Sequence, residues 1–119
     1  EMCIRDSIIP VEKEVAGMGL EMISPVLLDG YVGRTDVVII DVRSREAFEK
    51  AHIRGARNIP FGEKEGYRYF PKSRELILYC DRGSASLSQG RELAGKGYRV
   101  KSVIGGLDSY RGCNLVKNL

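Results

Sequence analysis

Two uninterrupted apolar runs mark the middle of the chain. Residues 37–40 read Val-Val-Ile-Ile, and residues 76–79 read Leu-Ile-Leu-Tyr. Neither run alternates with polar residues, which is typical of strands that are buried on both faces of a parallel sheet. The pattern therefore predicts two central, parallel strands.

Helical patterns flank these runs. Over residues 84–96, small and apolar positions such as Gly90 and Ala94 fall on one arc of a helical wheel, whereas Gln89 points elsewhere. Small residues on that arc would let the helix lie close to a sheet. Ser24 and Ser44 are candidate helix caps. Helices are therefore expected over 25–29, 45–51, 84–96 and 107–111, and further extended segments over 56–59 and 98–104.

Strands that alternate with short helices predict an α/β domain with a mainly parallel sheet flanked by helices. In open sheets of this kind, functional residues lie at the carboxyl ends of the strands. Asp41 follows the first apolar run and Cys80 follows the second. We expect both side chains at one edge of the sheet.

Length and composition fit one domain of this class. The chain has 119 residues, of which 43% are hydrophobic and 29% are charged, so one core of ordinary size is expected. No apolar stretch reaches the roughly 20 residues needed to span a bilayer. The net charge is +3 and the basic residues are scattered, which gives little support for nucleic-acid binding. We therefore expect neither a membrane nor a nucleic acid as a partner.

The first residues are set apart from the rest. The chain begins with Glu1, residues 1–17 show no helix or strand period, and Met18 could itself be a start. We expect a non-native or disordered tail over 1–17 and a single domain over 18–119. Cys3 is accordingly not expected to be a functional residue.

The three cysteines, Cys3, Cys80 and Cys113, have neither the spacing of a metal site nor that of a disulfide framework. This usage predicts a cytoplasmic location in which a free thiol is the functional group. It predicts no metal and no cofactor. Cys113 could resolve a persulfide formed at Cys80, but an ordinary thiol is the simpler interpretation.

Cys80 is the main candidate for chemistry. It stands where the second apolar run meets the predicted start of a helix, whose first backbone N–H groups lack intrahelical partners. Those donors and the helix dipole favour an anion, and the thiolate is the reactive form of cysteine. Gly83 allows the backbone to curve around the sulfur with φ values that a side chain would resist. Ser84 and Ser86 could add hydroxyl donors, although Ser86 is expected first to cap the helix.

Three stretches together resemble the rhodanese family of sulfurtransferases. They are residues 40–60, which read IDVRSREAFEKAHIRGARNIP; residues 79–86, which read YCDRGSAS; and residues 103–107, which read VIGGL and are followed by Tyr110. The three occur in the order and spacing of a single-domain member, over about residues 24–111. The resemblance implies a five-stranded parallel sheet flanked by helices, with Cys80 as the nucleophile that carries a persulfide.

The activity implied by this resemblance moves a sulfane sulfur from thiosulfate or a persulfide, through Cys80, to a thiol or cyanide. The acceptor thiol could belong to a partner protein. Asp41 and Arg43 are interpreted as a structural hydrogen-bond or ion-pair network. The positions expected to bind substrate are Asp81, Arg82, Gly83, Ser84, Ala85 and Ser86.

Two positions depart from the family pattern. Many members have Arg five residues after the cysteine, where this chain has Ala85, and many have Trp where this chain has Tyr110. The first departure concerns the binding of an anionic donor such as thiosulfate, because a positive charge in the loop helps to bind an anion. Arg82 could supply the missing charge, partly offset by Asp81. The second departure concerns packing more than chemistry.

Other functions remain open at this point. A cysteine-loop phosphatase or arsenate reductase needs a Cys-x5-Arg loop, but Ser86 stands at the sixth position and the next arginine is Arg91. A non-catalytic module for protein binding or sulfur sensing would keep the fold without transferring sulfur. His52 gives little support for a cysteine protease and is expected to be structural. The aromatic residues over 67–70 are interpreted as core packing.

Overall fold

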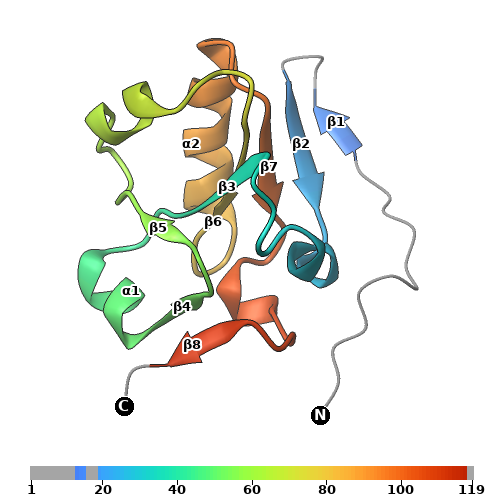
Figure 1. The fold of residues 1–119 in the computed structure, drawn as a ribbon, viewed down its shortest axis with the longest axis vertical. Helices are drawn as coiled ribbons and strands as arrows, with labels where there is room; N and C mark the ends of the chain where they lie inside the picture. Colours follow the sequence, from blue (N-terminus) through green and yellow to red (C-terminus); the bar gives the residue numbers. More distant parts are fainter. Residues whose placement is uncertain (1–12, 16–18, 118–119) are drawn as a thin grey trace.

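The computed structural model describes residues 13–15 and 19–117 and shows a central twisted sheet (Figure 1). Its strand order is β1-β2-β7-β6-β3-β5, and all neighbours are parallel except the antiparallel pair β1 and β2. The predicted mainly parallel sheet is therefore confirmed. The strands are β1 Lys13–Val15, β2 Leu20–Ile23, β3 Val37–Asp41, β5 Arg57–Asn58, β6 Glu75–Tyr79 and β7 Val100–Val103.

Short helices and a small second sheet surround this sheet. Strands β4 and β8 form an antiparallel pair near the C-terminal end of the chain, beside α1 (Figure 1). The remaining elements are the 3-10 helices η1 Pro25–Gly30, η2 Glu65–Tyr69 and η3 Leu107–Ser109, the α-helices α1 Arg45–Lys50 and α2 Ser84–Gly95, and the strands β4 Ala51–Ile53 and β8 Leu115–Lys117.

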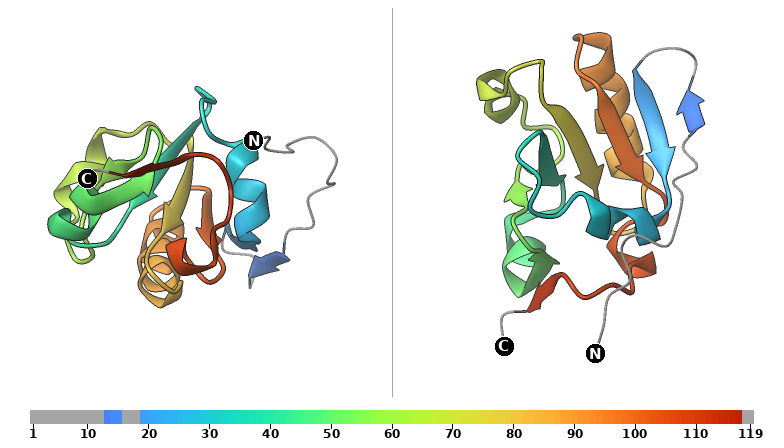
Figure 2. Two further views of the ribbon diagram at one scale, coloured as in Figure 1. Left: turned by 90° about the horizontal axis from the view of Figure 1, so that it is seen from below. Right: turned by 45° about the vertical axis from the view of Figure 1, so that its right-hand side comes forward.

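Each face of the sheet has its own hydrophobic core. Successive side chains of a strand point to opposite faces, so Val38 and Leu78 pack under α2, while Ile39 and Tyr79 pack under η1 and η3. Figure 2 shows α2 and η1 on opposite sides of the sheet. Because both faces are covered, residues 37–40 of β3 and residues 76–79 of β6 are apolar without alternation, which is the pattern seen in the sequence.

Local signals explain where several helices begin. The side chain of Ser24 accepts a hydrogen bond from the N–H of Val26, and Ser44 accepts one from Ala47. Both serines cap as predicted. On α2, an added Cβ at Gly90 would lie 3.0 Å from Leu20 Cδ1. The glycine therefore allows the close approach of helix to sheet that its small size predicts.

The structure also contains elements that the sequence pattern does not predict. Strands β2, β4 and β8 are only three or four residues long, too short to show a period. Helix η2 lies in a segment for which no helix is predicted. Strand β1 lies within the expected tail, at residues for which no element is predicted.

Tyr79 connects the main sheet to the small one. Its side chain is fully buried, and its hydroxyl oxygen accepts a hydrogen bond of 2.9 Å from the N–H of Ile53 in β4. Burial raises the pKa of Tyr79 far above its ordinary value, so the phenol stays neutral and available for this bond. The carboxyl end of β6 is thereby hydrogen-bonded to β4 of the small sheet.

Replacing this phenol tests the connection. In Tyr79→Phe, the buried N–H of Ile53 loses its acceptor, and we expect the free energy of unfolding to fall by about 1–3 kcal/mol. Urea denaturation measures the loss. Tyr69→Phe is the control, because Tyr69 is 81% exposed, and it should change stability by less than about 0.5 kcal/mol. Equal effects of the two substitutions would contradict a structural role for the Tyr79 hydroxyl.

Candidate active site

Cys80 lies directly after β6 and ahead of α2, at the carboxyl edge of the sheet. It is a free cysteine with 5% of its surface exposed. Its Sγ accepts hydrogen bonds from the N–H of Gly83 at 3.0 Å and from the N–H of Ser86 at 3.4 Å. The sulfur is therefore buried among backbone donors as well as apolar side chains, which is a geometry suited to an anion.

Gly83 makes this arrangement possible. Its φ is +106°, in the left-handed region, and it occupies the N-cap of α2 without a side-chain cap. A Cβ at this position would lie 3.1 Å from the backbone nitrogen of Gly105, so the turn has little space for a side chain. Because no side chain caps the helix, its first N–H groups remain available to the sulfur.

Ser86 lies behind the sulfur and does not cap the helix, so the expectation of a capping role is wrong. Its hydroxyl donates to the carbonyl oxygen of Gly83 at 3.1 Å and lies 2.8 Å from Ser102 Oγ and 3.7 Å from Cys80 Sγ. Ser86 is the third residue of α2, so its side chain turns back toward the sheet. The serine supports the loop from within the core.

Ser102 is a member of this site that the sequence does not single out. It is a buried polar residue in the middle of β7. Its only sequence signal is a small polar residue inside a predicted strand. The contact with Ser86 joins β7 to the first turn of α2, directly behind Cys80.

The turn after β7 forms the second wall of the site. The N–H of Leu107 donates to the Cys80 carbonyl oxygen at 2.8 Å, and the N–H of Asp108 donates to that of Asp81 at 3.0 Å. Gly106 has a φ of +60°, and a Cβ there would lie 2.3 Å from the Cys80 oxygen. Gly105 and Gly106 belong to the VIGGL stretch that carries part of the family resemblance, and their turn holds the cysteine loop in place.

A buried ion pair supports the loop from the other side. Arg43 donates hydrogen bonds to both carboxylate oxygens of Asp41, and its Nη1 lies 3.5 Å from the Asp81 carboxylate. Burial is the largest single effect on Arg43 and opposes its charge, but the hydrogen bonds to Asp41 and the negative charges of Asp41 and Asp81 act together to raise the pKa of the guanidinium. Arg43 also donates to the carbonyl oxygen of Ala51. Asp41 and Arg43 thus form a network that connects β3, the cysteine loop and β4.

The other loop positions differ in exposure. The side chain of Arg82 is 87% exposed and lies 3.6 Å from the carboxylate of Asp108. Ser84 is also exposed, and Ala85 is partly buried against the core below α2. Arg82 and Ser84 therefore lie on the outer side of the loop, whereas Ser86 lies on its inner side.

The remaining candidates lie apart from this loop. His52 stacks on Phe48 with ring centroids 4.0 Å apart, and its Nδ1 lies 2.8 Å from the Phe48 carbonyl oxygen, which is a structural arrangement. Tyr67 is buried as expected, but Tyr69 is exposed. Only part of the aromatic cluster over 67–70 therefore belongs to the core. Cys3 lies outside the described residues.

Cys113 is disulfide-bonded. The structure thus differs from the expected ordinary thiol, and it leaves Cys113 no thiol with which to resolve a persulfide. Spacing along one chain cannot show such a bond, because cysteine pairing is a property of the folded chain.

Within residues 13–15 and 19–117, no three His, Cys, Asp or Glu side chains are grouped so that they could hold a metal ion. In the same part of the chain, no helix has the length and apolar character to cross a membrane.

Gly106 offers a direct test of the second wall. Its φ of +60° and ψ of −156° suit glycine only, and the added methyl group of Gly106→Ala would collide with the Cys80 carbonyl. We expect a loss of about 3 kcal/mol in the free energy of unfolding, from backbone strain and forced displacement together. Gly62→Ala is the matched control, because Gly62 also has a positive φ but has open space around it; it should lose about 1 kcal/mol. Urea denaturation compares them, and equal losses would show that the contact with Cys80 is unimportant.

Comparison with known proteins places this geometry in a family. The rhodanese-like domain family matches residues 24–113. A tRNA sulfurtransferase of Desulfurococcus amylolyticus is 38% identical over 76 residues, which are 64% of this chain and 15% of that protein. The thiosulfate sulfurtransferase GlpE of Coxiella burnetii is 30% identical over 82 residues, covering 67% of this chain and 77% of that protein.

The solved structures agree with the sequence comparisons. The crystal structure of a rhodanese-like domain protein from Staphylococcus aureus superimposes with a TM-score of 0.72 at 23% identity, covering 82% of this chain and 98% of that one. At this identity the likeness concerns the fold. Together with the family match over residues 24–113, it leads to one conclusion: the chain belongs to the rhodanese-like domain family.

Proposed function

We propose that this chain is a sulfurtransferase in which Cys80 carries the transferred sulfur. The observation that supports the proposal most directly is the pair of backbone N–H groups, from Gly83 and Ser86, that point at Cys80 Sγ. The names of the curated relatives, tRNA sulfurtransferase and thiosulfate sulfurtransferase, support the same reaction class.

The proposed reaction has two balanced steps. In the first, the Cys80 thiolate attacks the sulfane sulfur of a donor, a new S–S bond forms on Cys80, and the donor's own bond to that sulfur breaks. Thiosulfate would leave as sulfite, and a persulfide would leave as a thiolate. In the second step, an acceptor thiolate or cyanide attacks the outer sulfur, and Cys80 leaves again as a thiolate.

Both steps keep negative charge on sulfur at the same place. A free cysteine is only a few per cent thiolate at pH 7, so the site must favour the anion. A charge near a helix terminus is stabilised by about 0.3–2 kcal/mol, and charge-assisted N–H bonds add to this. With these interactions the thiolate needs no catalytic base to form. This agrees with the position of His52, whose ring stacks on Phe48 and whose Nδ1 contacts the Phe48 carbonyl oxygen.

The roles of the loop residues follow from their positions. Asp81, Arg82 and Ser84 are the exposed members of the loop, and we assign Arg82 and Ser84 to contact with donor and acceptor. Asp81 is held by Arg43, and Ala85 leaves space where many relatives have arginine. Ser86 acts from inside by fixing the Gly83 carbonyl.

The acceptor could be a thiol on a small molecule or on a partner protein, and a cytoplasmic location stays a prediction. The other candidate function, a protein-binding or sulfur-sensing module without catalytic transfer, would use the same fold. The two functions differ in whether Cys80 gains and then releases sulfur.

Mass spectrometry of the intact protein distinguishes these two functions. After incubation with thiosulfate or a low-molecular-weight persulfide, we expect a gain of one sulfur atom that maps to Cys80 and is removed by cyanide or a thiol. Cys80→Ser should abolish the gain and the turnover and keep the fold, because the two side chains have nearly the same size. Ser88→Ala, on the exposed side of α2, is the control and should behave as the wild type. Absence of any gain with every sulfane donor would refute the proposal.

Arg82 provides a test of donor specificity. Removing an exposed positive charge should weaken the attraction of dianionic thiosulfate by about 0.2–1 kcal/mol, so Arg82→Ala should raise the KM for thiosulfate by up to about fivefold. The effect should shrink at high salt, because exposed charges are screened. Arg91→Ala on α2 is the control for net charge. An unchanged KM in Arg82→Ala, measured at low ionic strength, would remove Arg82 from donor binding.

A further inference from the structure

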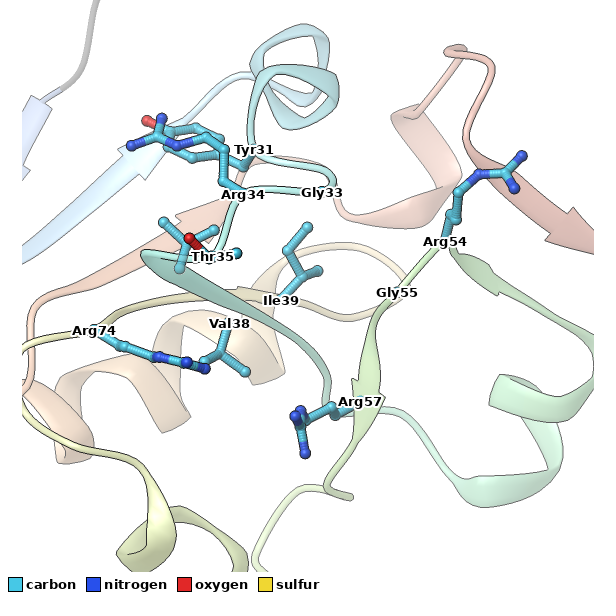
Figure 3. A pocket seen from close by; sticks show the side chains of 11 residues that line it. Tyr31, Gly33, Arg34, Thr35, Val38, Ile39, Arg54, Gly55, Arg57 and Arg74 are labelled. Carbon is cyan, nitrogen blue, oxygen red and sulfur yellow. The ribbon is translucent and has the colours of Figure 1, made fainter.

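A cavity lies beside the first half of β3, and the cysteine loop does not line it (Figure 3). Its volume is about 280 Å³, and its apolar floor is formed by Val37, Val38 and Ile39. Gly33 and Gly55 lie on its rim. This cavity, called the β3-edge pocket below, has no part in the proposed sulfur transfer.

The pocket exists because the neighbouring strand is short. Strand β5 pairs with β3 only at Ile40 and Asp41, so the first three residues of β3 have β6 on one side and no paired strand on the other. Along a strand, successive peptide groups point to alternate sides. The Asp36 carbonyl accepts from Glu75 of β6, whereas the Asp41 carbonyl accepts from Ile59 on the β5 side.

This alternation decides which peptide groups face the pocket. Val37 and Ile39 lie four and two residues before Asp41, so their peptide groups point to the same side as that of Asp41. Their N–H groups therefore face the pocket. Such an edge offers N–H donors to a ligand, alternating with carbonyl oxygens. The floor of the pocket is therefore apolar in its side chains and polar along its edge.

Two guanidinium groups complete the pocket. Figure 3 shows the side chains of Arg57 and Arg74 on the same side of β3, pointing toward one another below Val38. Phe70 lies 5.6 Å from the Arg57 guanidinium and so restricts its position. Among the described residues, neither arginine has a carboxylate within 4.0 Å.

The other two arginines of the rim are occupied or point away. Arg34 forms a two-point pair with Asp36 and stacks on Tyr31. The side chain of Arg54 extends away from the pocket floor (Figure 3). The positive charge that is available to a ligand comes from Arg57 and Arg74.

We propose that the β3-edge pocket binds the phosphate group of a small phosphate monoester. Two unpaired guanidiniums match the charge of −1.5 to −2 that such a group carries at neutral pH, and each can bind two of its oxygens. A single carboxylate would leave one guanidinium without a counter-charge. The apolar floor suits the organic part of the ester, and a volume of about 280 Å³ limits that part to a small molecule.

This site is separate from Cys80. None of the residues that line the pocket belongs to the cysteine loop, to the Asp41–Arg43 pair or to the turn at Gly106. Phosphate binding should therefore be measurable with Cys80 unmodified. The failure of one proposal leaves the other in place.

Phenyl phosphate, inorganic phosphate and benzoate are the probes for a test by NMR titration at constant ionic strength. We expect phenyl phosphate to give saturable shifts of the Val37 and Ile39 amide signals, with inorganic phosphate weaker and benzoate at least tenfold weaker. Arg74→Gln and Arg57→Gln should each reduce the affinity for phenyl phosphate at least tenfold. Arg91→Gln, an exposed arginine of α2, is the control and should bind as the wild type.

Several outcomes would overturn this proposal. They are equal affinity of Arg74→Gln and wild type for phenyl phosphate, equal affinity of the wild type for phenyl phosphate and benzoate, and the absence of saturable shifts at Val37 and Ile39 with phenyl phosphate. Arg74→Gln is the decisive variant, because Arg57 also contacts Phe70 and its replacement could disturb the fold. The urea midpoint of each variant shows whether the fold is intact.

Discussion

The convergence of two backbone N–H groups on one sulfur atom is the interaction on which the site depends. Gly83 and Ser86 supply them, and they reach Cys80 only because α2 begins immediately after a glycine in the left-handed region. A side-chain cap would use the same donors. The site therefore relies on an uncapped helix terminus, and its electrostatics come from the backbone more than from ionisable side chains.

The rest of the fold holds this terminus in place. The sheet brings the ends of β3, β6 and β7 to one edge, and each neighbouring segment contacts the cysteine loop through a different interaction. The turn at Gly106 binds the loop carbonyls, Arg43 binds Asp81, and Ser102 binds Ser86. A loop fixed at three points loses little entropy when it binds a sulfur donor, which suits the proposed transfer of a small group.

Prediction from the sequence succeeds where a signal is local and fails where it is not. The helix predicted over 84–96 is present as Ser84–Gly95, because its small and apolar residues recur with a helical period. Gln89, expected to point elsewhere, is buried and accepts a hydrogen bond from the Gly62 N–H, a partner that no helical wheel includes. Strands β4 and β8 pair across about 60 residues of chain, and each is too short to show a period.

The sequence by itself determined the two central strands, the helix that follows Cys80, the glycine that its terminus requires and the family to which the chain belongs. Each of these depends on neighbouring residues, through side-chain period or backbone conformation. The tertiary structure alone decided that Ser102 and Gly106 support the cysteine loop, that Ser86 faces inward, and that Arg57 and Arg74 line one pocket beside β3. Those contacts join residues that are far apart in the chain, and only the order of strands in the sheet brings them together.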